Sequence, residues 1–194
     1  MATMYSRYSH SAWSIGGALS RWWWGVRISL RATDKEPWIF AFVLGAIVAA
    51  FGFALHAVFA HQDEQRDLAC LAKNVYFEAR GEPVSGQVAV AQVTMNRWAS
   101  RRYADTLCGV VYQKNWDPIR KRYVGAFSWT ELDAMPAPRG DKWLQAWNVA
   151  EAVYYGREAR EVGGAMFYHA TYIKPQWAKE KREIARIGNH VFYK

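Results

Sequence analysis

The chain has 194 residues, of which 52% are hydrophobic, so it is long enough for one globular domain and a separate membrane segment. Its formal net charge of +8 suits a polyanionic partner such as cell wall, anionic lipid or nucleic acid. The basic residues form no dense cluster after residue 60, and the chain has no recognisable nucleic-acid motif, so we expect no nucleic-acid partner.

Residues 1–37 are basic and rich in tryptophan. They hold five Lys or Arg against two Asp or Glu, and residues 22–24 are all Trp. Trp and Arg suit the headgroup layer of a membrane, so one interpretation is a short interfacial helix. The other interpretation is a disordered cytoplasmic tail.

Residues 38–60 are almost purely apolar and contain no Asp, Glu, Lys or Arg. At about 1.5 Å per residue a helix of this length crosses a hydrocarbon core of about 30 Å. Basic residues precede the run and mostly acidic residues follow it, so the positive-inside rule predicts a cytoplasmic N-terminus and residues 61–194 outside the inner membrane. A signal peptide cleaved after Ala60 is the alternative, disfavoured by the long run and the 37 residues before it.

The sequence of residues 61–194 predicts one domain of the α+β class that is mainly helical. Helical spacing of apolar residues begins at Leu68 and ends near Ala79. A second helix, over about 84–98, is apolar on most sides and is therefore predicted to be the buried central helix.

A third helix is predicted from 141 to 155, with Trp143 and Trp147 facing inward. Short aromatic runs at 165–169 and 190–193 predict small strands. Prolines and glycine between 118 and 140 predict a middle region rich in loops.

Glu78 is the candidate catalytic residue. It borders the apolar face of the first helix and lies in its last turn, because Gly81 and Pro83 end that helix. Burial and the negative end of the helix dipole both raise a carboxyl pKa, and a carboxyl that stays protonated near neutral pH can serve as a general acid. The alternative is a structural ion pair with Arg80.

Glu82 invites a second catalytic role, but it precedes Pro83, and a residue before proline is disfavoured in a helix. We expect it to cap the next helix by accepting backbone N–H bonds. Ordinary glycoside hydrolysis uses two carboxylates, and the possible second carboxylates are Asp117, Glu131 and Asp133.

Seven segments, in order, resemble the SleB/CwlJ-type cell-wall hydrolase family, and the resemblance covers nearly all of residues 68–194. The segments are 70–82, 86–93, 96–97, 108–113, 127–130, 168–172 and 188–193.

The resemblance implies a lysozyme-like domain that acts on peptidoglycan without a cofactor. Spore-cortex members of the family are described as lytic transglycosylases with one catalytic glutamate, which corresponds to Glu78. The implied reaction cleaves the β-1,4 bond between N-acetylmuramic acid and N-acetylglucosamine and leaves a 1,6-anhydro sugar. Such an enzyme would serve a bacterium or a phage alike.

Eight further residues are candidates for substrate binding, and structural packing is the alternative for them. Gln87 and Asn96 are polar residues on a mostly apolar helix, so their amides need partners. The others are Phe127, Ser128, Trp129, Tyr168, His169 and Tyr172, whose aromatic members could stack on sugar faces.

Two alternatives concern His169, His190 and the cysteines. The histidines could join Glu78 as zinc ligands of a metal-dependent amidase, although their spacing matches no compact zinc motif. We therefore expect no metal. Cys70 and Cys108 are expected to form a disulfide if the domain lies outside the cytoplasm, and to be two buried thiols otherwise. A third functional alternative is an inactive, membrane-anchored module that binds cell wall.

Two features depart from the family pattern. Residues 114–125 are basic and resemble an insertion, and Ala126 stands where the family often has glutamine. Both bear on substrate contacts rather than on the acid.

Overall fold

The computed structural model describes residues 22–23, 37–118, 120–132 and 134–194, and it divides into two compact units, 1–57 and 58–194. In the first unit Trp22 and Trp23 are helical and exposed. The rest of the segment for which an interfacial helix or a disordered tail was considered lies outside the described residues.

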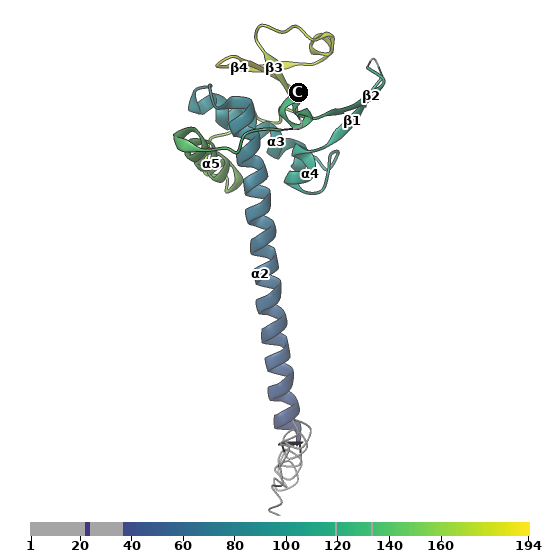
Figure 1. Ribbon diagram of the computed structural model, residues 1–194, viewed down its shortest axis with the longest axis vertical. Coiled ribbons are helices and arrows are strands. Elements are labelled where there is room, and N and C mark those ends of the chain that lie inside the picture. The colour runs from purple at the N-terminus through teal and green to yellow at the C-terminus, as the bar shows by residue number, and fades with distance from the viewer. Residues whose placement is uncertain (1–21, 24–36, 119, 133) are drawn as a thin grey trace, which may run out of the picture. The chain divides into compact units, whose positions relative to one another are not determined.

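The longest helix, α2 (Pro37–Ala79), begins at the predicted proline (Figure 1). Residues 37–57 of this helix are exposed on all sides. Among the described residues it is the one helix long and apolar enough, by length and composition, to cross a membrane. The helix continues without a break from the apolar run to the turn that carries Glu78. Residues 61–67 contain neither Gly nor Pro, the two residues that most disfavour a helix.

The core of the second unit forms where the last turns of α2 meet α3 (Val84–Ala99) and α5 (Gly140–Tyr154). Residues 86–94 of α3 are all buried, which confirms the prediction of a central helix. Trp143 and Trp147 of α5 pack against this core, as expected. In Figure 1, α3 lies between α5 and the short helix α4 (Leu107–Val111).

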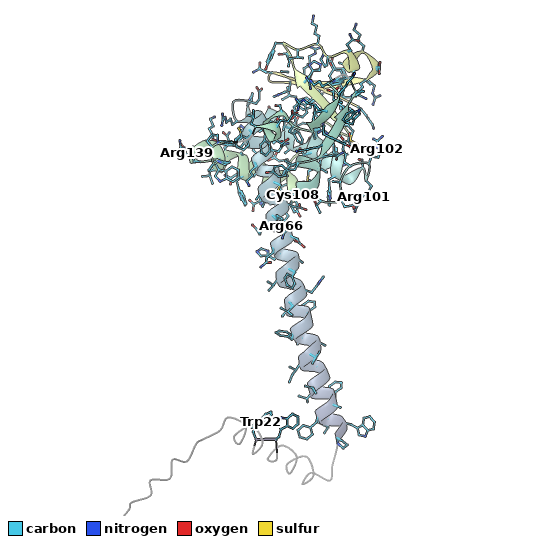
Figure 2. The ribbon with its side chains drawn as sticks, turned by 45° about the vertical axis from the view of Figure 1, so that its right-hand side comes forward. Trp22, Arg66, Arg101, Arg102, Cys108 and Arg139 are labelled. Atoms are coloured by element: carbon cyan, nitrogen blue, oxygen red, sulfur yellow. A yellow bond between two sulfur atoms is a disulfide. The ribbon has the colours of Figure 1, made fainter. Side chains whose placement is uncertain are left out.

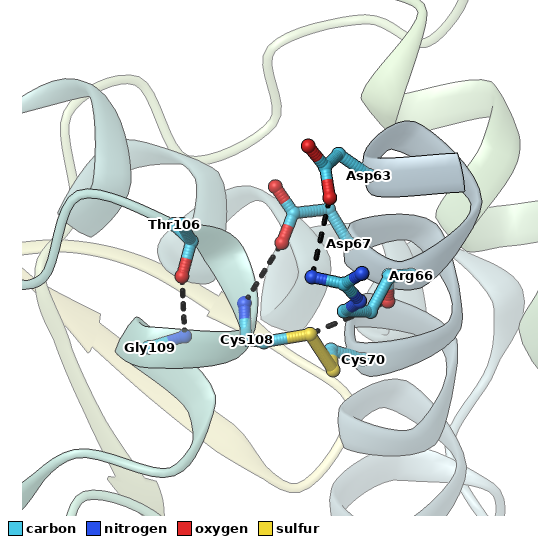
Figure 3. Close-up of polar contacts among 7 residues, drawn as sticks. All are labelled: Asp63, Arg66, Asp67, Cys70, Thr106, Cys108 and Gly109. Carbon is cyan, nitrogen blue, oxygen red and sulfur yellow. Dashed lines mark hydrogen bonds and ion pairs between the residues drawn. A yellow bond between two sulfur atoms is a disulfide. The ribbon is translucent and has the colours of Figure 1, made fainter. Parts of the chain in front are cut away.

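Helix α4 is held against α2 by two contacts, which Figure 3 draws together with the N-cap of α4. The structure pairs Cys70 of α2 with Cys108 of α4 in a disulfide. Oδ1 of Asp67 accepts a hydrogen bond from the backbone N–H of Cys108 at 3.1 Å. Thr106 caps α4 by accepting from the N–H of Gly109 at 3.0 Å. The carboxylate and the cap both satisfy N–H groups that a helix start leaves unpaired.

A three-stranded antiparallel sheet has the order β3–β5–β4, with β3 (Phe167–Ala170), β5 (His190–Tyr193) and β4 (Glu183–Ile187). The strands β3 and β5 confirm the two predicted aromatic strands. The central strand β5 is buried along its whole length, and its Phe192 packs in the cluster that includes the middle of α3. The strand β4 was not predicted, because its charged residues conceal the alternation.

The middle region contains more regular structure than the sequence predicted. A hairpin of β1 (Lys114–Asp117) and β2 (Arg122–Gly125) occupies the basic insertion, and Trp116 pairs with Tyr123 across it. Two 3₁₀ helices, η1 (Ser128–Glu131) and η2 (Gln176–Glu180), carry residues that matter for the site.

Candidate active site

Glu78 lies in the last turn of α2, partly buried, beside strand β3. The hydroxyl of Tyr168 in β3 donates a hydrogen bond of 2.9 Å to its Oε2. The helix ends at Ala79, and Glu82 N–H bonds the carbonyl of Ala79 at 2.9 Å, so a tight turn follows directly. The turn keeps later residues from continuing the helix over the carboxylate.

The pKa of the Glu78 carboxyl is raised, chiefly because burial disfavours its charged form. The hydrogen bond from Tyr168 and the charge of Arg97 oppose this effect without cancelling it. The pKa of Tyr168 is raised well above its usual value by burial and by the neighbouring carboxylate. Tyr168 therefore keeps its proton at neutral pH and remains a hydrogen-bond donor to Glu78.

The carboxyl opens into a cleft of about 480 Å³. Helix α2, strand β3, the start of η1, the loop to η2 and strand β5 all contribute to its lining. The lining residues are Phe77, Glu78, Ser128, Tyr168, His169, Ala170, Tyr172, Ile173, Pro175, Trp177 and His190. A site of this kind presents aromatic surface beside one acid.

Four of the expected substrate residues line this cleft with Glu78. Ser128 and Tyr172 are exposed at its surface, with 83% of Tyr172 accessible. Tyr168 and His169 form its β3 side. These four remain available to a bound sugar, so their assignment as substrate residues stands as a prediction.

Phe127 and Trp129 lie instead in the core, where only 3% and 8% of their surfaces are exposed. Trp129 stacks on Phe77 at a centroid distance of 4.7 Å, and its indole N–H donates to Oδ1 of Asn74 at 2.9 Å. Core packing was the alternative considered for Phe127 and Trp129, and both residues pack in the core. They fix the position of Ser128, which lies between them in the sequence.

Asn74 sits one helical turn before Glu78 and is completely buried. Its amide N–H₂ donates to the hydroxyl of Thr94 at 3.0 Å, while its oxygen accepts from Trp129. Thr94 in turn donates to the carbonyl of Val90 in α3. This series of hydrogen bonds joins the end of α2 to α3 and η1. It therefore fixes the position of the helix end that carries Glu78 relative to Ser128.

Gln87 and Asn96 also serve the interior rather than the Glu78 cleft. Gln87 is 1% exposed, and its amide donates to the carbonyl of Glu82. The amide of Asn96 donates to the carbonyls of Val162 and Ala165, at 3.4 and 3.0 Å. Their amide N–H₂ groups are used by neighbouring backbone and neither residue lines the Glu78 cleft, so the structure gives the predicted substrate contact no support.

Glu82 does not cap α3 with its side chain, contrary to expectation. Its two oxygens instead accept from the backbone N–H and the side-chain amide of Asn189, at 2.8 and 3.0 Å. Gly188 permits this contact, because a Cβ there would lie 2.1 Å from Oε2 of Glu82. These hydrogen bonds thus join the turn between β4 and β5 to the turn that follows Glu78.

The two histidines have different surroundings. Both ring nitrogens of His169 are hydrogen-bonded, one to the carbonyl of Ala170 and one to the hydroxyl of Tyr193, each at 2.9 Å. His190 is buried, lies edge-on to Tyr168, and has a pKa lowered chiefly by burial. Among the described residues no group of three or more His, Cys, Asp or Glu could hold a metal ion.

Trp177 is the main cleft residue that sequence reasoning missed. It lies in η2, and its ring contacts His169 and Tyr193 at centroid distances of 5.6 Å each. A single turn of 3₁₀ helix has no periodicity to reveal it. The one usable signal was an isolated tryptophan two residues after a proline, in the loop that follows an aromatic strand.

Two of the three possible second carboxylates, Glu131 and Asp117, do not line the cleft. Glu131 binds Arg122 at 2.8 Å and the N–H of Gly125 at 3.1 Å, which lowers its pKa. Asp117 forms an ion pair with Arg120 at 3.5 Å. Asp133 lies outside the described residues. Among the described residues that line the cleft, Glu78 is the one carboxylate.

This fold and this cleft can be compared with known proteins. A family model described as Cell Wall Hydrolase matches residues 81–193, more than half of the chain and beginning three residues after Glu78. The chain therefore belongs to the cell wall hydrolase family, as the sequence motifs indicated.

Two curated relatives give the comparison its detail. A spore cortex-lytic enzyme of Oceanobacillus iheyensis is 33% identical over 136 residues, covering 67% of this chain and 42% of that protein. The Bacillus subtilis enzyme of the same description is 47% identical over 129 residues, covering 65% and 37%. The match thus spans less than half the length of these curated relatives.

A solved structure is also similar. The catalytic domain of the germination-specific lytic transglycosylase SleB from Bacillus anthracis aligns with a TM-score of 0.52 and 28% identity, covering 67% of this chain and 95% of that domain. The second unit therefore has the fold of the SleB catalytic domain, mainly helical with a few strands.

Proposed function

We propose that this protein is a lytic transglycosylase that cleaves the β-1,4 bond between N-acetylmuramic acid and N-acetylglucosamine in peptidoglycan. The observation that carries the proposal is the lone carboxylate of the Glu78 cleft. The similarity of this chain to a catalytic domain described as a lytic transglycosylase supports the same reaction. A lysozyme-like arrangement, with the acid at the end of a helix beside a small sheet, accords with this chemistry.

In the first step Glu78 is the general acid. Its raised pKa keeps the carboxyl protonated into a pH range where an exposed glutamate would be ionised. The proton passes to the glycosidic oxygen, the bond from that oxygen to C1 of N-acetylmuramic acid breaks, and the N-acetylglucosamine side leaves as an alcohol. Glu78 is then a carboxylate facing a cation at C1.

In the second step the same carboxylate is the base. It removes the proton from the 6-hydroxyl of the muramic acid, whose oxygen bonds C1 and closes the 1,6-anhydro ring. Glu78 ends protonated, as it began, and neither water nor a second carboxylate takes part. Ordinary hydrolysis would need a second carboxylate as base or nucleophile, and the described lining offers none.

The other cleft residues hold the acid and the sugar. Tyr168 fixes the carboxyl by its 2.9 Å hydrogen bond and stabilises the ionised form between the two steps. Tyr172 and Trp177 offer aromatic faces for sugar rings. Ser128 and His169 supply polar groups near the acid, His169 after exchange of one of its present hydrogen bonds.

We further propose that residues 38–60 anchor the protein in the inner membrane, with residues 1–37 in the cytoplasm and 61–194 on the cell-wall side. The length and apolar composition of α2 support a membrane span. The charge difference across the apolar run supports this orientation. A disulfide between Cys70 and Cys108 accords with an oxidising compartment.

The test is mass spectrometry of the fragments that the full chain, purified in detergent, releases from peptidoglycan. We expect muropeptides that end in 1,6-anhydromuramic acid, one water lighter than hydrolysed products. The Glu78→Gln variant serves as the control and should release none. Reducing muramic ends would refute the transglycosylase mechanism, and free stem peptides would indicate an amidase instead.

A further inference from the structure

A second cleft, of about 600 Å³, borders the same strand as the Glu78 cleft. Phe167 lines the second cleft, and the next residue of β3, Tyr168, lines the first. Trp177 of the Glu78 cleft also contacts Phe167, at a centroid distance of 5.8 Å. A ligand in one cleft is therefore within reach of the other.

Three cations line this second cleft, which we call the cationic cleft: Arg102, Lys181 and Lys194. Among the described residues, no Asp or Glu lines this cleft. Within the described part of the chain, no ion pair neutralises any of the three, whereas five arginines elsewhere are paired with carboxylates. Unpaired cations gathered round a cavity favour an anionic ligand.

Packing positions one of these cations and brings a second beside the cleft. The Nζ of half-buried Lys181 lies 3.8 Å above the centre of the Phe167 ring. The Lys194 side chain is exposed and passes over Gly164, where a Cβ would lie 3.3 Å from its Nζ. The Lys181 ammonium is thus held on the cleft wall.

The cationic cleft also presents hydrogen-bonding groups beside its charges. The side chains of Gln113 and Asn115 both line the cleft, and the Gln113 amide nitrogen donates to the Asn115 side-chain oxygen at 3.0 Å. Side-chain amides beside cations suit a ligand that carries both carboxylates and hydrogen-bonding groups, as an acidic peptide does.

We propose that the cationic cleft binds the acidic peptide stem of the peptidoglycan strand whose sugar occupies the Glu78 cleft. The inference rests on the proposed function. The stem is attached to N-acetylmuramic acid, the sugar at which Glu78 acts, and carries carboxylates and backbone N–H groups. An extended peptide spans about 3.3–3.6 Å per residue, so a stem of several residues reaches from one cleft to the other. Asn115 lies in the hairpin of the insertion, so this chain's departure from the family pattern contributes to the cleft.

The test compares two soluble glycan oligomers, one with intact stems and one with stems removed, and measures kcat/KM with the full chain in detergent. We expect the protein to prefer the stem-bearing oligomer. The Arg102→Met/Lys181→Met variant should lower this preference about tenfold through KM, because charge-assisted hydrogen bonds to the stem are lost. Stems with amidated carboxylates should be cleaved no better than stem-free glycan.

The matched control is Arg139→Met/Lys142→Met, which removes one Arg and one Lys that are exposed at the start of α5. Figure 2 shows Arg102 and Arg139 on opposite sides of the second unit. The control should keep the wild-type preference. An unchanged preference in the Arg102/Lys181 variant, or an equal loss in both variants, overturns the proposal.

A binding measurement separates this proposal from the proposed function. The free acidic stem peptide should bind the Glu78→Gln protein and should bind the Arg102→Met/Lys181→Met form of it about tenfold more weakly. If no oligomer is cleaved but this difference is seen, the proposed function fails and the stem site stands. If poly(glycerol phosphate) shows the difference and the stem peptide does not, the cationic cleft is a phosphate site and the proposal fails.

Discussion

Tyr168 and Glu78 are 90 residues apart in the sequence, and their side chains are joined by a 2.9 Å hydrogen bond. The bond lowers the pKa of Glu78, while burial, the larger effect, raises it. The pKa of Glu78 is therefore set by two opposed effects: burial at the end of α2 raises it, and the hydrogen bond from Tyr168 in β3 lowers it. An acid that must later act as a base benefits from such a donor, since the donor stabilises the ionised form without taking its proton.

Replacing Tyr168 with Phe should move the alkaline limb of the pH–kcat/KM profile to higher pH. The variant lacks the hydrogen bond that lowers the Glu78 pKa, so the carboxyl keeps its proton further into the alkaline range. Tyr155→Phe is the matched control, because Tyr155 also bonds a glutamate, Glu64, at 2.8 Å but outside the cleft. A limb that stays in place or moves to lower pH would contradict the assignment of Glu78.

Replacing Glu78 with Gln should abolish cleavage, at least about 10³-fold, because the only acid of the described cleft lining is lost. It should also raise the melting temperature at neutral pH. A raised folded-state pKa gives stability that is present below the unfolded pKa, about 4.3, and lost as pH rises through the folded pKa. The amide has no such dependence.

The melting temperatures of the Glu78→Gln variant and the wild type should therefore converge below about pH 4 and separate as pH rises. Thermal scans across this range measure the difference. A Gln variant less stable than wild type at neutral pH would show that the ionised carboxylate stabilises the fold, as a structural ion pair would.

Removing the Cys70–Cys108 bridge should destabilise the second unit. The bridge closes a loop with a sequence separation of 38, for which chain entropy predicts a loss of about 4 kcal/mol. Denaturant unfolding of the Cys70→Ser/Cys108→Ser variant should show this loss, and reduced wild type should behave similarly. Thiol titration of the denatured, unreduced protein should detect neither Cys70 nor Cys108 as a free thiol. Detection of two free thiols would reject the bridge.

Replacing Gly188 with Ala should cost about 1–3 kcal/mol of stability, a range typical of local strain. The added Cβ would lie 2.1 Å from Oε2 of Glu82, and the backbone has φ of +55°. Gly163→Ala is the control, since nothing lies within 4 Å of its Cβ position and no strained φ is involved. Adding Glu82→Ala to the Gly188 variant should restore part of the lost stability. If Gly188→Ala is as stable as Gly163→Ala, the turn accommodates the added Cβ without loss of stability and the prediction is wrong.

Patterns along the chain were enough to predict the three long helices and the two aromatic strands, but not α4 or the two 3₁₀ helices. Apolar spacing placed the last turns of α2, α3 and α5, since periodicity reports directly on which side of a helix is buried. It also placed Glu78 in a last turn at the border of an apolar face. The hairpin of the insertion and β4 escaped prediction, because short charged strands depend on their partners rather than on their own pattern.

The sequence by itself therefore determined the apolar run, the helical framework, the position of the acid and the family. Only the tertiary structure decided which polar and aromatic residues line the Glu78 cleft. It assigned Phe127, Trp129 and Gln87 to the interior and brought Trp177 to the cleft. Local patterns cannot separate these outcomes, because a Trp or an amide suits core and cleft equally well. The difference arises from contacts such as Trp129 with Asn74, whose residues are 55 positions apart and meet only in the folded chain.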